Sequence, residues 1–432
     1  PPDTGSPDTS QPSDTTLPPD DTEMPDTQDP DDTDPGGDTT EPDIPDVPAE
    51  PMGSVVSVGS LEASGLHFLS LLGVAVDMTP DTLVVGAPGA DIDGVDHAGA
   101  VYIYTRNADE QWVERQRLEP ETPTEDGSLG QFLHIRDDRL VVAEPGLRQL
   151  HLYTPTGDGM WSRDQTLGHT PPPGLSGPLW GHRIALEGPW LAVTLLVSQE
   201  QYGEVVVYRL EPGEAVEVSR LSPEGPNTVG FGRGLDIKGD RLWVAAPEAP
   251  GGGAIYSYAL TTGAGAVLDR VIEGFAGAST LGSDMDRGEA GFVYGDSMLD
   301  LGAGGLWWSP QSPSDTDTLV QLPLWDVDQG GGGVAGVDVE ISPRFVATGA
   351  LIDSTFVFQG GAGYVWRVMP DGPPVPFAKI FGEGRADVWC GYSIAAAGDW
   401  LALGCPFGGG ELESGSVWLY RWSPEPPLSD LD

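Results

Sequence analysis

The segment Leu72-Gly73-Val74-Ala75-Val76 is followed by Leu83-Val84-Val85-Gly86-Ala87-Pro88 and then by Gly99-Ala100-Val101-Tyr102-Ile103-Tyr104, and this pattern recurs along the chain. The first glycines of the copies are Gly73, Gly130, Gly181, Gly232, Gly282, Gly336 and Gly391. Self-similarity at a period of about 50 residues indicates one supersecondary unit copied in an array, as in propeller blades. The chain therefore contains seven repeated units.

Each unit consists of short runs of β-branched and aromatic residues separated by Gly, Asp and Pro, and no run is long enough for a periodic helix. The turn between the first two runs is often Gly-Asp, as at Gly239-Asp240 and Gly398-Asp399, where hairpins favour residues that tolerate positive φ. A fourth run, such as Trp112–Leu118, follows in most copies. Four antiparallel strands form the blade of a β-propeller, so we predict an all-β, seven-bladed β-propeller.

The two ends of the repeat region give a second test of this prediction. The seventh unit has no fourth run after Tyr420, and the strand Ser54–Val58 precedes the first unit without a unit of its own. Placing this strand on the outer edge of the seventh blade closes the ring and removes an unpaired edge. We therefore expect a propeller over residues 53–424, closed by residues 54–58. The alternative is an open β-solenoid, whose repeats are usually shorter, about 20 to 45 residues.

The repeat resembles a known family. Leu-Gly-x-Ala-Val or Phe-Gly-x-x-Leu, followed by Val-Gly-Ala-Pro, is similar to the FG-GAP repeat of the integrin α-subunit N-terminal propeller, in the form found in bacterial surface proteins. The first unit (Gly73 with Gly86–Pro88) and the fourth (Phe231-Gly232 with Ala245–Pro247) match best, and the third, fifth and sixth have lost the Ala-Pro element. The resemblance implies a propeller fold, but propellers host binding, scaffolding and catalysis alike.

Integrin-type repeats often have a calcium loop in the turn between the first and second strands. The corresponding turns here are too short to supply the roughly six to eight oxygens that Ca²⁺ takes. A loop between the second and third runs of the first unit contains Asp91, Asp93 and Asp96 around Gly94. It could wrap a calcium ion, although it lacks the later bidentate acid and lies in a different turn. The other interpretation is a solvated acidic loop, and we expect no cofactor to be required.

Residues 1–52 are rich in Pro, Asp and Thr and contain almost nothing that could pack. Such a segment should be disordered and extended, which suits an acidic stalk, and residues 425–432 form a short tail. The chain begins at Pro1 without a signal segment, so we expect any N-terminal membrane or cell-surface anchor to lie outside it. A stalk before a propeller predicts an extracytoplasmic protein, secreted or held at a bacterial outer surface.

The charge balance limits the partners. The formal net charge is −47, and the only lysines are Lys238 and Lys379. Nucleic acid is excluded, because phosphate contacts require clustered cations. The longest apolar run, around Phe68–Val76, is too short to span a bilayer, so we expect no transmembrane segment. The acidity favours cationic ligands or reflects adaptation to a saline habitat. We expect a monomer.

The search for catalytic groups finds none. No histidine lies in a metal-spaced pair, and neither a Gly-x-Ser-x-Gly elbow nor a phosphate loop is present. Loops on a rigid scaffold are where binding residues concentrate, so the candidate ligand-binding residues are Trp180, Trp325 and Trp389 in the rim connections and His182 near the axis. The alternative for His182 is a hydrogen-bonded structural role. For most tryptophans packing between blades is the default.

The only cysteines, Cys390 and Cys405, fall at the outer ends of two strands of one expected hairpin. They are near-diagonal neighbours there, so a disulfide is geometrically feasible. The alternative is a pair of small buried thiols.

Two functions remain open. The first is a non-catalytic binding or adhesion module that presents its loop face to a protein or glycan partner. The alternative is a secreted propeller enzyme, a hydrolase or lyase acting on a polysaccharide in the central channel. A cluster of acids with a His or Tyr converging on the axis would favour the enzyme.

Overall fold

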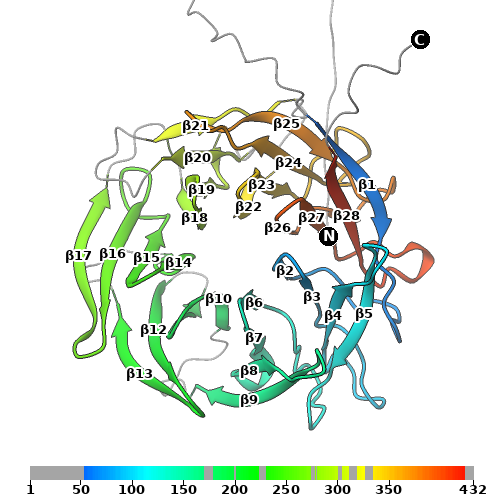
Figure 1. The fold of residues 1–432 in the computed structure, drawn as a ribbon, viewed down its shortest axis with the longest axis horizontal. Coiled ribbons are helices and arrows are strands. Elements are labelled where there is room, and N and C mark those ends of the chain that lie inside the picture. Colours follow the sequence, from blue (N-terminus) through cyan, green and yellow to red (C-terminus); the bar gives the residue numbers. More distant parts are fainter. Residues whose placement is uncertain are drawn as a thin grey trace, which may run out of the picture. The chain divides into compact units, whose positions relative to one another are not determined.

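The computed structural model describes residues 53–169, 179–198, 201–222, 230–273, 278, 280–299, 304–310, 319–325 and 334–423. They form seven four-stranded antiparallel sheets arranged in a ring (Figure 1). The predicted fold class, an all-β seven-bladed propeller, is thus confirmed. The expected stalk at 1–52 and tail at 425–432 lie outside the described residues.

Each blade places its first strand nearest the axis. Blades 1 to 3 contain β2 (Val76–Met78), β3 (Thr82–Ala87), β4 (Ala100–Arg106) and β5 (Trp112–Leu118); β6 (Leu133–Arg136), β7 (Arg139–Glu144), β8 (Gln149–Pro155) and β9 (Trp161–Gly168); and β10 (Leu179–Glu187), β11 (Trp190–Ser198), β12 (Gln201–Glu211) and β13 (Glu214–Leu221). Short 3₁₀ turns occur at Pro145–Leu147 (η1) and Gly410–Leu412 (η3).

The remaining blades repeat this order. Blades 4 to 7 contain β14 (Gly234–Lys238), β15 (Arg241–Ala246), β16 (Ala254–Thr261) and β17 (Gly265–Glu273); β18 (Leu281–Gly288), β19 (Gly291–Asp296), β20 (Leu306–Ser309) and β21 (Val320–Leu322); β22 (Ala335–Ile341), β23 (Phe345–Ala350), β24 (Ala362–Arg367) and β25 (Val375–Ile380); and β26 (Ser393–Ala397), β27 (Trp400–Cys405), β28 (Ser416–Ser423) and β1 (Ser54–Ser60).

The ring closes on blade 7. Strand β1 pairs antiparallel with β28, with Ser54 opposite Ser423 and Val56 opposite Arg421. The first and last strands of the repeat region thus share one sheet, and the outer edge that the seventh unit lacks is supplied by the start of the chain.

The core lies between the blades. The second strands are buried on both faces, as in β3, where Leu83, Val84 and Val85 have no exposed surface, because each blade is covered on both sides by its neighbours. Across the closing seam, the rings of Trp112 and Trp400 pack edge to face with centroids 5.7 Å apart. Where a polar residue occurs in a central run, it is hydrogen-bonded: the Thr194 hydroxyl donates to the Gly232 carbonyl at 2.6 Å.

The repeat glycine and the Gly-Ala-Pro element occur together because they contact each other. The Gly73 N–H donates to the Gly86 carbonyl at 3.0 Å, and the Gly391 N–H donates to the Gly404 carbonyl at 2.9 Å. Gly391 has φ +84°, which favours glycine, and its carbonyl oxygen lies where a Cβ on Gly349 of the preceding blade would be. The two glycines therefore let adjacent blades approach at backbone distance near the axis.

Candidate functional site

The four candidate rim residues have different environments. Trp180 was expected in an exposed rim connection, and this was wrong: it lies in β10, is 0 % exposed and stacks on His169 at 4.9 Å. The residue before the repeat glycine is buried in all seven blades, and Trp180, which occupies this position in blade 3, lies in the core between blades 2 and 3. Trp325 is half-buried and packs edge to face on Tyr364 and Trp366. Trp180 has no surface available to a ligand, whereas Trp325 remains a candidate.

The other two rim candidates lie nearer solvent. Trp389 is half-buried, with φ +53°, and its ring packs edge to face on Phe407 at 5.0 Å. His182 lines the central channel and packs against Phe132 at 5.2 Å. Burial, with the positive charges of Arg183 and Arg233 adding to the effect, lowers the pKa of His182 to about 3. The imidazole is therefore neutral at ordinary pH, and both residues remain candidates only.

The loop with Asp91, Asp93 and Asp96 does not assemble as a calcium site. Asp91 accepts a hydrogen bond from the His97 N–H at 2.9 Å, whereas Asp93 lies at the exposed tip of a tight turn in which Ile92 bridges Val95. Burial of Ile92 turns the intervening carboxylate outward. Within the described ranges, no three acidic, histidine or cysteine side chains are grouped so as to hold a metal ion.

Cys390 and Cys405 form a disulfide with an S–S distance of 2.03 Å. Cys390 precedes the repeat glycine of blade 7 and Cys405 ends β27, so the bond ties the entry of the blade to its second strand. Both sulfur-bearing residues are buried in the core between blades 6 and 7.

The central channel is where polar chemistry converges. It contains a cavity of about 210 Å³ whose wall receives residues from the first strand of all seven blades. In Figure 1 these strands, from β2 to β26, surround the axis. A cavity of this size has room for on the order of ten water molecules or a small organic ion. The channel is therefore the candidate functional site.

Most of the charged residues of the wall occupy two positions of the repeat. Side chains alternate along a strand, so residues two and four places after the repeat glycine share one face. The second position is occupied, in blade order, by Ala75, Phe132, Arg183, Gly234, Asp284, Asp338 and Ser393. The fourth is occupied by Asp77, His134, Ala185, Asp236, Asp286, Glu340 and Ala395. We call these the upper layer and the lower layer; six of their fourteen members are carboxylic acids.

Most of the wall acids join neighbouring blades. In the lower layer, Asp77 accepts a hydrogen bond from the Ile135 N–H at 2.7 Å, and Asp286 accepts one from the Ile341 N–H at 2.8 Å. Each acid thus bonds the innermost strand of the next blade. Hydrogen bonds from backbone N–H groups to a carboxylate are strong, so these contacts position the inner strands around the axis.

The upper layer has the same contacts and its own cation. Asp284 and Asp338 accept hydrogen bonds from the N–H groups of Val339 and Ile394 at 3.0 and 2.7 Å, and the two carboxyl groups also hydrogen-bond each other. Arg183 Nε lies 3.2 Å from Asp284 Oδ1.

The Arg183 guanidinium also donates to two carbonyls in other blades, those of Arg233 at 2.9 Å and Val337 at 2.8 Å. Arg183 thus extends from blade 3 across the axis to blade 6.

Two acids of the lower layer lack such contacts. Asp236 is 6 % exposed, and Asp236 and Glu340 have no hydrogen bond or ion pair with any residue that the structure describes. The next N–H in the pattern for Asp236 belongs to Arg287, which instead donates to Asp286 Oδ1 at 2.7 Å. Arg136, on the same wall, has a buried Nε without a partner among the described residues.

The electrostatics of the wall follow from this crowding. Burial raises the pKa of Asp236 to about 8, and the charge of Asp286 adds to the effect. Burial likewise raises the pKa of Asp284 and raises those of Asp338 and Glu340 well above their usual range, with neighbouring carboxylates contributing. Burial raises these pKa values because it removes the water that would stabilise the charged form of each acid.

Sequence reasoning missed these wall acids. With 67 Asp and Glu residues in the chain, no single pair stood out. The available signal was positional: aligning the seven repeats on their glycines places Asp236, Asp286 and Glu340 in one column. That column could have been found, but the missing contacts of Asp236 and Glu340 could not.

A second feature lies on the loops of blades 6, 7 and 1. Four large apolar side chains are exposed there, Phe356 and Phe358 at 64 % each with Leu412 and Phe68. The loops contact one another in series: the Asp387 N–H donates to the Phe358 carbonyl at 3.1 Å, and the Leu72 N–H donates to the Ser414 carbonyl at 2.9 Å. We call Phe68, Phe356, Phe358 and Leu412 the apolar loop face.

Hydrogen bonds to the buried carboxylate of Asp353 anchor the loop that contains Phe356 and Phe358. Asp353 Oδ2 accepts hydrogen bonds from Lys379 Nζ at 2.9 Å and from the Tyr364 hydroxyl at 2.8 Å, and Asp353 Oδ1 accepts one from the Thr355 N–H at 2.9 Å. Burial would raise the pKa of Asp353, but these hydrogen bonds outweigh it and lower the pKa. The ionised carboxylate therefore anchors the loop beneath its exposed rings.

Comparison with known protein families identifies the repeat of the first blade. Residues 59–104 match the model of the FG-GAP repeat. No curated protein sequence matches the chain. A protein from Lactobacillus plantarum is 14 % identical, with a TM-score of 0.48, covering 72 % of this chain and 85 % of that one.

Two further solved structures are similar in fold. A 6-phosphogluconolactonase homologue from Bacteroides fragilis is 10 % identical, with a TM-score of 0.49, covering 77 % of this chain and 96 % of that one. A virginiamycin B lyase from Staphylococcus aureus is 10 % identical, with a TM-score of 0.46, covering 86 % and 99 %. At these values neither structure bears on what this chain does. In the described part of the chain, no helix is long and apolar enough to cross a membrane.

Proposed function

Because this chain is an FG-GAP repeat β-propeller protein, we propose that it is a non-catalytic, extracytoplasmic binding module that docks a protein partner on its apolar loop face. The observation that supports this most is the exposure of Phe356 and Phe358 on a loop anchored by buried Asp353. Large apolar side chains gathered on one part of a surface are typical of interaction sites. A loop that is already ordered loses little entropy when it binds.

The chemistry of the loop face favours a protein over a glycan. Phe356, Phe358, Phe68 and Leu412 have no polar group with which to recognise hydroxyls, and apolar anchors of this kind are typical of the centre of protein interfaces. The net charge of −47 should select a partner with basic residues around an apolar centre. Adhesion at a cell surface is one use of such a module.

A comparison of two double variants tests the proposal. The full chain is immobilised, and retention of extracellular proteins from its host is measured for the wild type and for Phe356→Ser with Phe358→Ser. The matched control, Val267→Ser with Leu268→Ser, removes two exposed apolar side chains from the outer strand β17 of blade 4.

We expect the loop variant to lose the proteins that the control retains. Equal retention by both variants would overturn the loop face as the docking site. Binding to a glycan array that depends on the same two phenylalanines would replace the protein partner with a glycan.

One observation favours a second candidate, an enzyme acting in the channel. The wall brings acids with raised pKa values together with His182 and Tyr392, and a protonated carboxyl near the axis is suited to general acid catalysis. Because Arg183 extends across the axis, such an enzyme would act on a small substrate rather than a threaded polymer. Turnover of a glycosidic or ester substrate that Glu340→Gln abolishes would favour this candidate.

A further inference from the structure

The lower layer of the channel has less positive charge facing its acids than the upper layer has. In the upper layer, Asp284 and Asp338 share a hydrogen bond and face the Arg183 guanidinium. The positive charge of Arg183 offsets the charge of this pair. The protein thus already contains one example of what these walls bind, a guanidinium held by a carboxylate and backbone carbonyls.

The lower layer has no equivalent arrangement. His134 Nδ1 lies 2.9 Å from Asp77 Oδ2, which accounts for one of the four acids. Asp236, Asp286 and Glu340 then face Arg136, whose pKa the lower-layer acids raise against the opposing effect of burial, and the charge of Arg287 also acts on Asp236. Three acids against two arginines leave the layer short of positive charge.

The polar atoms without partners lie where that charge is missing. Asp236, more than nine-tenths buried, and Glu340 are on the cavity wall in blades 4 and 6, with Asp286 between them in blade 5. Neither acid has a hydrogen bond or ion pair among the described residues, although the acids at the same repeat position in blades 1 and 5 each bond the next blade. A buried carboxylate without a partner is unfavourable unless a ligand or a proton satisfies it.

We propose that the channel binds a small organic cation, an alkylguanidinium or alkylammonium group, between the carboxyl groups of Asp236 and Glu340. Such a group donates several hydrogen bonds, and a guanidinium matches two carboxylates at once. A metal ion fits less well, because the described residues contain no group of three or more acidic, histidine or cysteine ligands arranged for one. The cavity of about 210 Å³ accommodates a group of this size.

The bound cation replaces a proton. In its absence a proton takes its place on Asp236, because burial, with the charge of Asp286 adding to the effect, raises the pKa of this acid to about 8. In and beside the lower layer the groups facing this pair are Asp77, His134, Arg136, Glu187, Asp286 and Arg287; in and beside the upper layer they are His182, Arg183, Asp284, Asp338 and Tyr392. None of them supplies a further mobile cation, so affinity should rise with pH between about pH 6 and pH 8.

The probe for the test is methylguanidinium, and methylurea is its neutral control of the same shape. Binding to the full chain is measured by calorimetry at physiological salt, which screens the general attraction of an acidic surface over about 8 Å. The variants are Asp236→Asn and Glu340→Gln, with Asp138→Asn, an exposed acid at the turn between β6 and β7, as the matched control. The amide variants mimic the protonated acids, so they should fold, and their melting temperatures are measured alongside.

We expect methylguanidinium to bind, methylurea not to bind, and both channel variants to weaken binding about tenfold or more, as expected for the loss of a charged hydrogen bond. The control should stay within about twofold. Repeating the titration in buffers of different ionisation enthalpy should show about one proton released per cation.

Absence of binding from about pH 6 to pH 9, or equal weakening by Asp138→Asn, would overturn the site. An arginine-containing peptide, compared with the same peptide containing citrulline, then distinguishes the source of the cation. Tighter binding of the peptide than of methylguanidinium indicates a side chain of a partner, and weaker binding indicates a free small molecule. Because the probe needs no loop-face partner, this result is independent of the proposed protein docking.

Discussion

Blades 7 and 1 differ from blades 5 and 6 both in sequence pattern and at the channel wall. Blade 1 has Gly86-Ala87-Pro88 and blade 7 has Gly404-Cys405-Pro406, whereas the equivalent segments of blades 5 and 6 have lost the proline. At the wall, the first pair contributes mainly alanine and serine, with Asp77 the single acid among its layer positions, whereas the second contributes four acids. The comparison teaches that the two blades that close the ring contribute little charge to the channel wall, whereas blades 5 and 6, which have lost the proline, contribute four of its six acids.

The largest effect on stability is expected in blade 7, where the ring closes. Reducing the Cys390–Cys405 bond, which closes a loop with a sequence separation of 15, should lower the free energy of unfolding by roughly 3 kcal/mol. Denaturant titration with and without reductant measures it, and the loss should be the same at pH 5 and pH 8. The double variant Cys390→Ala with Cys405→Ala is the control, since reductant should leave it unchanged. An identical midpoint for the oxidised and reduced wild type would contradict the prediction.

The backbone approach between blades 6 and 7 should be the next most sensitive. A Cβ on Gly349 would overlap the carbonyl oxygen of Gly391, so Gly349→Ala should destabilise the protein by about 2 kcal/mol. Gly157, which has open space around it, provides the matched control, and Gly157→Ala should change stability by less than about 0.5 kcal/mol. Thermal unfolding followed by circular dichroism compares the two. Equal effects would show that glycine contact does not fix the spacing of the blades.

The stability of the blades that supply the wall acids, blades 4 to 6, should depend on pH. Because folding raises the pKa of Asp236 from 3.8 to about 8, the folded chain holds a proton that the unfolded chain releases, and stability falls as pH rises from about 4 to 8. Asp236→Asn removes this loss, and the difference from the wild type between pH 5 and pH 8 should exceed about 1.4 kcal/mol, the value of one pKa unit.

The control for the pH experiment is Asp138→Asn, which removes one charge outside the channel. It should leave the slope of stability against pH close to that of the wild type. Parallel slopes of stability against pH for all three proteins would mean that Asp236 does not hold a proton in the folded chain. The two sides of the ring would then not differ in their response to pH.

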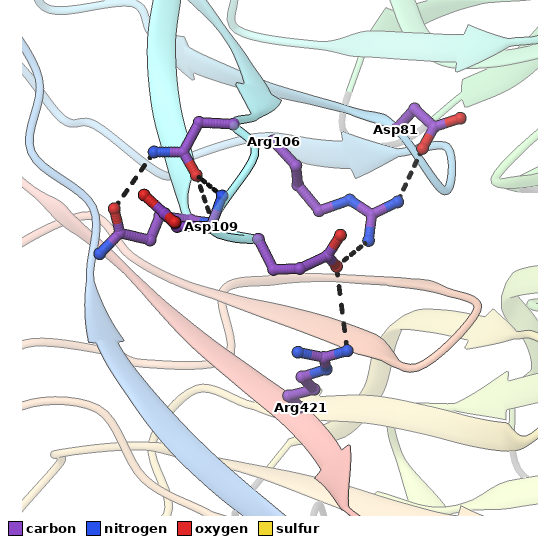
Figure 2. A network of polar contacts seen from close by, with 7 residues as sticks. Asp81, Arg106, Asp109 and Arg421 are labelled. Atoms are coloured by element: carbon purple, nitrogen blue, oxygen red, sulfur yellow. Dashed lines mark hydrogen bonds and ion pairs between the residues drawn. The ribbon is translucent and has the colours of Figure 1, made fainter.

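The smallest effect is expected for the surface ion pairs across the closing seam. Figure 2 shows Arg106 between Asp81 and Glu110, each at 2.7 Å, with Glu110 also 3.8 Å from Arg421 of blade 7. These side chains are largely solvated, so Glu110→Gln should lower stability by less than about 0.5 kcal/mol, and high salt should abolish the difference. A larger, salt-resistant loss would show that this seam depends on charge as well as on β1.

Much of the fold could be predicted from the repeats. The glycines from Gly73 to Gly391 fixed the number of blades, and the strand at 54–58, left without a unit, is β1 on the edge of blade 7. Local patterns suffice for such features because a repeated unit must bury the same face against its neighbour. The burial of Trp180 was not predicted, although the residue before the repeat glycine is apolar in all seven repeats, and this pattern was the available signal.

The candidate site could be predicted only in part. His182 was expected near the axis and lines the channel. The importance of Asp236 and Glu340 depends on hydrogen bonds that their counterparts make and they do not, and on acids from neighbouring blades that come together at the axis. A repeat alignment gives the position of a residue within its blade, but it does not show whether a backbone N–H of the next blade donates to that residue.

The pairing of β1 with β28 also determines how the ring responds to mechanical force. Since Ser54 lies opposite Ser423, the strands leave the sheet at the same end, and tension between them opens the hydrogen bonds one after another, starting from that end. A load applied at Ser54 and resisted at the far end of β28 would instead stress the same bonds together in shear. Pulling on the adjacent ends at Ser54 and Ser423 should therefore unfold the propeller at a lower force than pulling on opposite ends of the two strands. A pulling experiment can measure the ratio of these two unfolding forces.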